Sequence, residues 1–512
     1  MRLLDRLQFA ARQCIPHSPG AGERIAVLVL CLLGAVHVFV FAAAFPFFSV
    51  VDEQAHFDLA VRYSQGEIPR SLTPPSEEAL LFIVFYGTPE YLWPPSSQPG
   101  GVIPPPPWRQ SMEQVRPLLL AKEAAYRDKF QNYEAASPPL YYALAGGCWR
   151  LGRLLQLDGG QLLYWLRFLN APLMALLVWL GWLAGRTVFP ENLFIRLSVP
   201  ALIAFLPQTS FYAINNDMLT PITFGAAFVL VIRFWEAPAP SVKLAAGCGL
   251  ALAAAYLTKT SNVPLLAAAA VFLLWKFARL AAGGTIRKSA PAIAALAATA
   301  ALPAGAWMLW CKANFGDFAG AGLKIHFLGW TDKPWPEWLH HPLFTPRGLW
   351  FFVERNLATF WQGEMLWQRQ PLSFPVVDAA YVILSLVVLT FALAALLRRR
   401  SPFSGPQRAA LAFGFLCLAA SFAFYAWLSV KYDFQDCFYP SRAHPFFVSG
   451  RLMLGMLVPF FILFAAGLDR LMNRFDAAMK FVAFLGLLAF MILTEIAIDQ
   501  PVFSNQYNWF HL

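Results

Sequence analysis

Long apolar runs, most of them about the length of a bilayer-crossing helix, recur from one end of the chain to the other. Polar and charged residues collect between these runs, which is typical of a membrane protein with many spans. The pattern therefore predicts an all-α, polytopic bundle of about eleven transmembrane helices. The predicted spans cover residues 25–48, 166–188, 194–213, 218–235, 243–257, 263–279, 291–311, 376–397, 409–430, 450–468 and 478–498.

One further apolar stretch, residues 137–155, is predicted to lie in the membrane interface and not to cross it. Its Arg150 and Arg153, beside Trp149, suit an interfacial helix. Leaving this stretch out of the spans also places the basic residues 398–400 on the inner side, as the positive-inside rule requires. With an odd number of spans and this orientation, the N-terminus is cytoplasmic and the C-terminus lies outside.

Composition agrees with a membrane protein, since 58% of the 512 residues are hydrophobic and only 13% are charged. The net charge of +10 does not indicate a nucleic-acid partner, because the Lys and Arg residues lie in short loops and form no single basic surface. The seven cysteines show no Cys-x-x-Cys spacing, so no metal-thiolate site is expected. No repeat or separate soluble segment is visible, and residues 1–512 are expected to form one transmembrane domain.

Three segments on the outer side hold most of the unusual polar residues, namely 49–165, 312–375 and 431–449. The first is rich in proline and too long for a structureless loop, so interfacial helices are expected within it. The inner loops, by contrast, are short and basic. This asymmetry predicts that the outer face is the working face and that the helices act as its scaffold.

Asp52, Glu53 and His56 follow the first apolar run directly. On a helix, His56 is four residues from Asp52 and three from Glu53, so a carboxylate and an imidazole share one face. Carboxylates at a membrane boundary must be hydrated, paired, bound to a metal or used, since burying them uncompensated is costly. The alternative is an ordinary solvated loop.

Other candidates lie near the predicted outer ends of later spans or at the start of the interfacial helix. Three of them have structural alternatives, because Asp217 can cap the next helix, Arg451 can extend from a helix end, and Lys259 can be a loop residue. Tyr141, with its neighbour Tyr142, can equally be an interfacial anchor. The candidates are Tyr141, Arg167, Asp217, Lys259 and Arg451.

A carboxylate after the first span, a Pro-Pro-Leu-Tyr-Tyr helix start, Arg167 and Asp217 together resemble the membrane glycosyltransferases of the GT-C class. The resemblance is to the branch with protein O-mannosyltransferases, the lipid A aminoarabinose transferase and many uncharacterised bacterial predicted membrane proteins. The last set is most similar, since its members carry an Asp-Glu-x-x-His pattern like residues 52–56 here. The likeness covers residues 48–259. Beyond them it rests on residues 450–452, where a leucine replaces the tyrosine of a Gly-Arg-Tyr-Leu pattern.

The resemblance implies a sugar donor carried on a polyprenyl phosphate, a glycan or lipid acceptor of the cell envelope, and transfer with inversion. It also implies the inner membrane of a bacterium, with membrane lipids around the chain and a periplasmic C-terminus.

An attacking hydroxyl needs a general base, for which Asp52 is the first candidate and Glu53 the second. A lipid phosphate needs positive charge and hydrogen-bond donors. The expected substrate-binding residues are His56, Tyr141, Arg167, Asp217, Lys259 and Arg451.

A divalent cation could be held by Asp52, Glu53, His56 and Asp217 if the outer loops bring them together. A monophosphate leaving group carries less charge than a diphosphate, so basic side chains can suffice. Neither a metal nor another cofactor is therefore expected.

Two other functions suit such a bundle: a transporter or flippase of a lipid-linked sugar, and an O-antigen polymerase or ligase. Transporters usually have two related halves with charged groups near the membrane midplane. Here the ionisable residues are expected at the ends of the spans, with polar features on one face. A polymerase or ligase would share the lipid-linked donor and the outer location, whereas a structural scaffold would leave the carboxylates without a use.

Overall fold

The computed structural model describes residues 20–48, 52–91, 94–437 and 439–512, which are mostly helical. Four strands of two residues each pair as β1 (Thr331–Asp332) with β4 (Tyr432–Asp433) and β2 (Leu366–Trp367) with β3 (Gln370–Pro371). The predicted all-α class is confirmed. The α-helices are α2 (Ala21–Ala44), α3 (Glu53–Ser64), α4 (Glu77–Tyr86), α5 (Met112–Lys129), α6 (Leu140–Leu154), α7 (Gly159–Arg167), α8 (Asn170–Val188), α9 (Leu193–Ala204), α10 (Leu219–Glu236), α11 (Val242–Thr258), α12 (Val263–Ala282), α13 (Ile286–Phe315), α14 (Gly322–Phe327), α15 (Trp335–Trp338), α16 (Pro346–Gln362), α17 (Pro375–Leu397), α18 (Gly405–Lys431), α19 (Leu457–Leu471) and α20 (Ala477–Phe503).

Nine helical segments among the described residues are long and apolar enough to cross a membrane, so the chain is a multi-pass membrane protein. Two further predicted spans correspond to α9 and α11, which are shorter apolar helices, so the count of eleven is not confirmed. The predicted cytoplasmic N-terminus falls outside the described residues. The nine segments are Ala21–Ala44, Gly159–Val188, Leu219–Glu236, Thr260–Ala282, Ile286–Phe315, Pro375–Leu397, Gly405–Lys431, Gly450–Leu471 and Ala477–Phe503.

The third predicted span, residues 194–213, is too long, because α9 ends at Ala204. Pro207 follows closely, and a proline lacks an N–H and disfavours helical backbone in the residue before it. The chain continues as a loop and the short 3₁₀ helix η4 (Thr209–Tyr212). This early end leaves a polar, buried connection before α10, and that connection carries Asp217.

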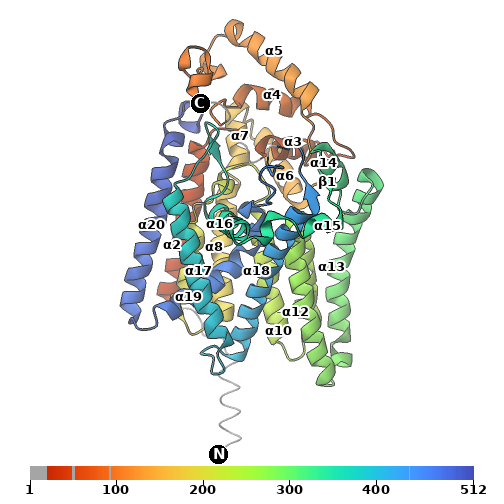
Figure 1. Cartoon of the computed structure of the whole chain (residues 1–512), viewed down its shortest axis with the longest axis vertical. Helices are drawn as coiled ribbons and strands as arrows, with labels where there is room; N and C mark the ends of the chain where they lie inside the picture. The colour runs from red at the N-terminus through yellow and green to blue at the C-terminus, as the bar shows by residue number, and fades with distance from the viewer. Residues whose placement is uncertain (1–19, 49–51, 92–93, 438) are drawn as a thin grey trace, which may run out of the picture.

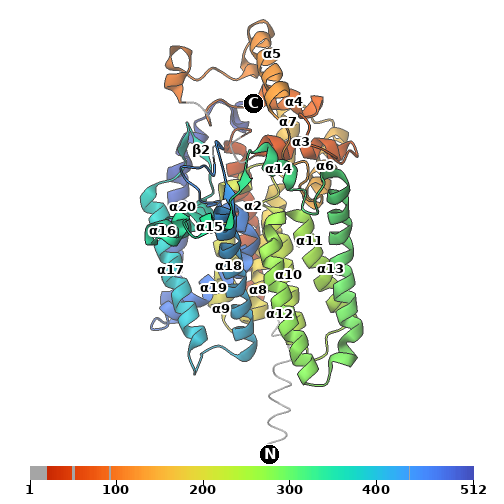
Figure 2. The same ribbon diagram turned by 45° about the vertical axis from the view of Figure 1, so that its right-hand side comes forward.

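The elements of the first outer segment gather at one end of the bundle. Helices α3 to α7 lie over that end of the long helices, near α14 and the C-terminus (Figures 1 and 2). The predicted interfacial stretch forms α6, which packs against α3 and α7 and is not among the candidate spans. We call this end of the molecule the outer end.

Helix α19 lies at the centre of the bundle, since 94% of its span is buried, compared with 17% for α13 and 28% for α20. Helices α13 and α20 expose large apolar side chains such as Leu302 and Leu493, which suits a perimeter in contact with lipid. The segment that leads into α19 therefore starts in the middle of the outer end. Arg451 lies in that segment.

Cysteine labelling tests which end of the bundle faces outward. In a cysteine-free background, a cysteine in place of Ser97 or Gln506 is expected to react with an impermeant thiol reagent on intact cells. Both positions are exposed, one in the loop between α4 and α5 and one in the C-terminal segment, and these segments lie at the outer end (Figure 1). Neighbouring Asn505 is buried and unsuitable. A cysteine in place of Arg399, exposed in the loop between α17 and α18, is expected to react only after permeabilisation. Labelling of the Arg399 variant in intact cells would contradict this orientation.

Candidate functional site

Asp52 lies immediately before α3 at the outer end, in a left-handed backbone conformation with φ 63° and ψ 17°. Few residues other than glycine adopt this conformation, although Asp tolerates it better than most. Such backbone persists where its surroundings hold it, and it is found most often at functional sites. The Asp52 side chain makes no capping hydrogen bond to α3 and instead accepts from Tyr133 and Arg451.

Arg451 reaches this point because Gly450 lets the 3₁₀ segment η7 (Gly450–Met456) lie directly against α16. A Cβ atom at position 450 would be only 2.2 Å from a backbone oxygen and a backbone nitrogen of α16, so a larger residue does not fit. The Gly450 N–H donates to Thr359 Oγ1 at 2.8 Å. The close approach of η7 to α16 fixes the position from which the Arg451 side chain extends.

Arg451 is surrounded by carboxylates from three separate segments. Its Nη2 is 2.8 Å from Asp52 Oδ2, its Nη1 is 3.5 Å from Asp217 Oδ2, and its Nε is 3.3 Å from Glu364 Oε1. The side chain is only 13% exposed. Arg451 is therefore an ion-pairing residue of the interior, and its alternative role as a helix-end residue extending to the interface is wrong.

Asp217 and Lys259 form a second buried ion pair in contact with the first. Asp217 does not cap α10, whose N-cap is Met218 without a side-chain capping bond. Lys259 ends α11 with its side chain turned inward, and burial lowers its pKa although Asp217 acts in the opposite direction. The alternatives of a helix cap and a solvated loop residue are thus both wrong, and Asp217 connects Lys259 to Arg451.

The loop between α5 and α6 adds residues that the sequence analysis missed. The Tyr133 hydroxyl donates to Asp52 Oδ1 at 2.5 Å, and the neighbouring Glu134 pairs with Lys324 of α14. Asn132 Nδ2 donates to a carboxylate and a carbonyl of α3, at 2.7 and 3.0 Å, and fixes this loop onto α3. The sequence offers one signal for these residues, which is their position just before the Pro-Pro helix start.

Glu364, two residues after the end of α16, was missed as well. It accepts a hydrogen bond from Ser449 and lies beside Arg451. Burial raises the pKa of Glu364, even though Arg451 lowers it. No local pattern marks this residue, because its partners are more than 80 positions away in the sequence.

We call this set the outer charge cluster. It consists of four carboxylates and three cations beside the Tyr133 hydroxyl, and its members come from seven different segments of the chain. The carboxylates and cations are Asp52, Glu134, Asp217, Glu364, Lys259, Lys324 and Arg451.

Protonation states within the cluster follow from burial and charge. Burial alone would raise the pKa of Asp52. The charges of Arg451 and Lys324 lower it by more than burial raises it, so the pKa lies well below its usual range. The pKa of Glu134 is about 2, because Lys324 outweighs the effect of burial. Burial lowers the pKa of His56. At neutral pH Asp52 and Glu134 are therefore ionised and lie near a neutral His56 imidazole.

His56 lies in the first turn of α3, buried, with Nδ1 2.7 Å from the Tyr142 hydroxyl. It is near enough to Asp52 and Asp217 for both charges to affect its pKa. Tyr141 and Tyr142 are 1% and 0% exposed, so their predicted alternative role as interfacial anchors is wrong. Whether His56 and Tyr141 contact a substrate stays a prediction.

Glu53 and Arg167 form a separate, fully buried ion pair. Arg167 Nη2 is 2.6 and 2.7 Å from the two Glu53 carboxylate oxygens, and Nε is 3.0 Å from one of them. The guanidinium also donates to three backbone carbonyls at and after the end of α2. Its five N–H groups thus have enough protein acceptors, which leaves none for a phosphate. Their roles in catalysis and phosphate binding stay predictions, but the geometry favours a structural role.

The residues considered for a divalent cation do not converge, because Glu53 faces Arg167 while Asp52 and Asp217 face Arg451. Across the described ranges, no group of three or more His, Cys, Asp or Glu side chains is placed to hold a metal ion. That the reaction needs no metal or other cofactor stays a prediction.

Chemically, the outer charge cluster offers a carboxylate that can accept a proton and, beside it, cations that can bind an anion. Both Arg451 and Lys259 are already paired with carboxylates. An incoming anionic group therefore has to compete with these pairs, and its binding would alter the charge felt by Asp52.

Fold and site together define a multi-pass helical membrane protein with a buried charge cluster at one end of its bundle. Residues 36–431 match the family described as predicted membrane protein (DUF2142), and the chain belongs to this family. The match confirms the predicted likeness to that group of membrane proteins. It includes Asp52, Asp217 and Lys259, whereas Arg451 lies beyond it. A search among curated proteins finds no match.

The chain is also similar to solved membrane-protein structures. ArnT from Cupriavidus metallidurans bound to undecaprenyl phosphate aligns over 96% of this chain and 75% of its own length, with 11% identity and a TM-score of 0.44. The archaeal oligosaccharyltransferase AglB from Archaeoglobus fulgidus, in complex with an inhibitory peptide and a dolichol-phosphate, aligns over 94% of this chain and 56% of its own length, with 13% identity and a TM-score of 0.39.

Proposed function

We propose that this protein transfers a sugar from a polyprenyl-phosphate-linked donor to a glycan or lipid acceptor of the cell envelope, at the outer face of a bacterial inner membrane. The observation that carries the proposal is the Asp52–Arg451 pair at the outer end, with Asp217 and Lys259 beside it. It brings a potential base and two cations together at the ends of the membrane-spanning helices. The resemblance of the sequence to GT-C enzymes supports the same reaction.

In the proposed reaction an acceptor hydroxyl oxygen attacks the anomeric carbon while the bond from that carbon to the phosphate oxygen breaks. The hydroxyl proton passes to the Asp52 carboxylate. The bonding electron pair leaves with the phosphate, whose negative charge grows, and Arg451 and Lys259 stabilise that charge. Attack on the side opposite the leaving group inverts the anomeric centre.

Arg451 connects donor binding with the strength of the base. While Arg451 pairs with Asp52, the low pKa of that carboxyl makes it a weak proton acceptor. A donor phosphate that binds Arg451 weakens this pair and raises the Asp52 pKa, because a negative charge nearby favours the protonated carboxyl. Asp52 would then be a stronger base with the donor bound than without it.

Envelope glycolipids are the direct cellular readout of this proposal. A strain that lacks the gene is expected to lose one glycolipid or glycan species in mass spectra, and wild-type protein to restore it. Protein with Asp52→Asn should not restore it, whereas Asp332→Asn, which changes an exposed carboxylate of the second outer segment, should. Full restoration by the Asp52 variant would contradict the proposal.

Phosphate binding by Arg451 and Lys259 predicts changes in donor kinetics. Arg451→Lys keeps the charge but loses the forked geometry, so the donor KM is expected to rise about tenfold. Lys259→Ala removes one cation and should raise the donor KM by a similar factor. The matched control is Arg442→Lys, which alters an exposed arginine paired with Asp433 outside the cluster. Unchanged donor KM in both cluster variants would assign these residues a structural role.

The raised pKa of Glu364 predicts how donor binding depends on pH. Its pKa is raised, so lowering the pH protonates it while Asp52 stays ionised, and Arg451 loses one competing carboxylate. The donor is a phosphodiester whose single charge does not titrate in this range, so the donor KM of the wild type should fall towards acidic pH. Glu364→Gln should lower the KM about threefold at neutral pH and remove most of this pH dependence. A KM profile identical in the variant and the wild type would contradict this role.

One observation favours the transporter or flippase as a second candidate. His37 Nε2 lies 2.9 Å from Glu495 Oε2 between α2 and α20, inside the apolar part of the bundle, and Tyr212 also donates to Glu495. The expectation that ionisable residues occur only at the ends of the spans is therefore wrong for this pair. Buried ionisable pairs within the membrane often mark transport pathways. The two functions differ in whether the sugar–phosphate bond breaks.

A further inference from the structure

A second polar site lies at the opposite end of the bundle from the outer charge cluster. This basal pocket has a volume of about 430 Å³ and is lined by the turns between α8 and α9, between α17 and α18, and between α19 and α20. Helix α19 connects the two ends, since it is preceded by Arg451 at the outer end and reaches Asp469 at the pocket. None of the residues assigned to the proposed reaction lines this pocket.

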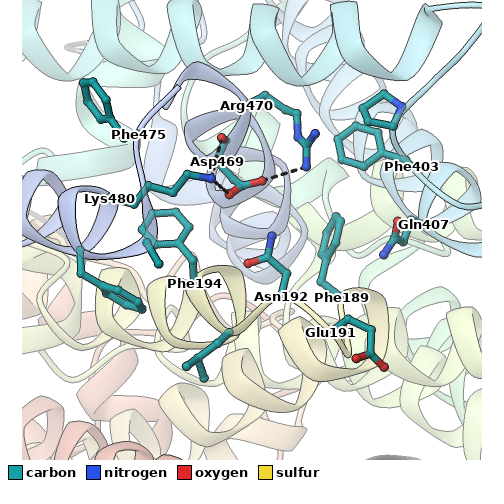
Figure 3. A pocket seen from close by; sticks show the side chains of 14 residues that line it. Phe189, Glu191, Asn192, Phe194, Phe403, Gln407, Asp469, Arg470, Phe475 and Lys480 are labelled. Atoms are coloured by element: carbon teal, nitrogen blue, oxygen red, sulfur yellow. Dashed lines mark hydrogen bonds and ion pairs between the residues drawn. The ribbon is translucent and has the colours of Figure 1, made fainter. Parts of the chain in front are cut away.

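Three charged side chains meet in the basal pocket. Asp469 Oδ1 is 2.6 Å from Lys480 Nζ, and Asp469 Oδ2 is 3.0 Å from Arg470 Nη2 (Figure 3). Asp469 is 3% exposed, whereas Arg470 and Lys480 are partly open to the pocket. The Arg470 Nε is buried and lacks a hydrogen-bond partner among the described residues. One buried carboxylate thus faces two cations, one of which keeps an unused donor.

The surroundings of the pocket add positive potential. The first turns of α9, α18 and α20 line it, and helix N-termini carry partial positive charge, which the Asp476 carboxylate that caps α20 offsets at that helix. Glu191, also in the lining, is exposed and turned away from Asp469 in Figure 3. Further basic side chains are exposed on the adjacent loops and helix ends, namely Arg398, Arg399, Arg400, Arg408 and Arg474.

Most of the remaining wall of the pocket is apolar, with Asn192 and Gln407 as further polar residues. Five phenylalanines contribute to the lining, and Phe403 lies 5.3 Å from the Arg470 guanidinium in a cation–π contact. The pocket lies where candidate membrane-spanning helices end, which is the depth expected for the head groups of one leaflet. Aromatic rings beside basic groups at this depth suit an amphiphile with a negative head and apolar chains.

We propose that the basal pocket binds an anionic phospholipid from the adjacent leaflet. Arg470 and Lys480 contact the head-group phosphate, the Arg470 Nε supplies one of the hydrogen bonds, and the phenylalanines contact the glycerol and upper acyl chains. Asp469 holds the two cations in place and limits their affinity, because it competes with the phosphate for both. This site is independent of the sugar-transfer reaction proposed for the outer end.

Native mass spectrometry of the full-length protein in detergent tests the site with phosphatidylglycerol as the probe. The double variant Arg470→Gln/Lys480→Gln is expected to weaken phosphatidylglycerol binding about thirtyfold relative to wild type, while Arg399→Gln/Arg474→Gln, which removes two exposed charges outside the lining, changes it little. Asp469→Asn should strengthen binding, because it frees both cations. Phosphatidylcholine, whose head group has no net charge, should bind weakly to every variant.

Several outcomes would overturn the proposal. Equal losses in the two double variants would mean that general surface charge, and not the pocket, attracts the lipid. Displacement of phosphatidylglycerol by millimolar inorganic phosphate would identify a site for free phosphate. If the double variant does not fold, the Asp469→Asn result decides, because weakened or unchanged binding would show that the three charges serve the fold alone.

Discussion

Loss of either partner of the buried Glu53–Arg167 pair is expected to destabilise the protein by about 3–5 kcal/mol, because the remaining charge would be buried without a counterion. Both side chains are 0% exposed, and the pair joins the end of α2, the start of α3 and the polar connection before α10. Arg167→Met should therefore lower the thermal unfolding temperature in detergent strongly. The matched control is Arg153→Met, which breaks a partly exposed pair with Glu78 and should cost about 0–1 kcal/mol.

A double change of Glu53 and Arg167 to Leu and Met should recover part of the lost stability, since it removes both charges. An unfolding temperature for Arg167→Met equal to that of the control would show that the pair does not support the fold. Arg167 would then again be a candidate for binding the donor phosphate.

Asp52→Asn is expected to lower turnover by about 100-fold or more, because asparagine keeps the size and polarity of the side chain but cannot accept a proton. Donor affinity should be unchanged or tighter, since Arg451 loses a competing carboxylate. Steady-state kinetics with the purified protein give both quantities, and Asp332→Asn is the control for an unrelated carboxylate of the outer end.

A fall in donor affinity at unchanged kcat would contradict the role of Asp52 as the base and would make it a binding residue. A turnover within a few-fold of wild type would exclude it from proton transfer altogether.

The hydrophobic pattern was sufficient to predict the long apolar helices. It did not give their exact lengths or the directions in which the side chains at their ends point. Helical spacing places Asp52 on one helix with Glu53 and His56, but Asp52 precedes α3 in a left-handed backbone conformation, so the direction of its side chain does not follow from helical periodicity. Only the folded structure shows that Glu53 faces Arg167 and Asp52 faces Arg451. Likewise, the length of the apolar run did not show that the third span ends before Pro207. The polar connection that holds Asp217 follows this proline.

Residues with a local signal were found, and residues without one were missed. Lys259 and Arg451 stand out as cations beside apolar runs, whereas Glu364 is an ordinary polar residue in a long loop and Tyr133 is marked only by its position before the Pro-Pro helix start. Asp52 and Arg451 are 399 positions apart, so their pairing depends on Gly450 allowing η7 to pack against α16. Such long-range packing has no counterpart in the local sequence.

The most direct measurement of the central claim uses purified protein in liposomes with a labelled polyprenyl-phosphate sugar and an extract of envelope acceptors. The proposed transferase releases polyprenyl phosphate only when acceptor is present, and Asp52→Asn abolishes this release while Asp332→Asn does not. Movement of the intact labelled lipid across the bilayer, with no cleavage of the sugar–phosphate bond under any condition, would contradict the account and identify a flippase.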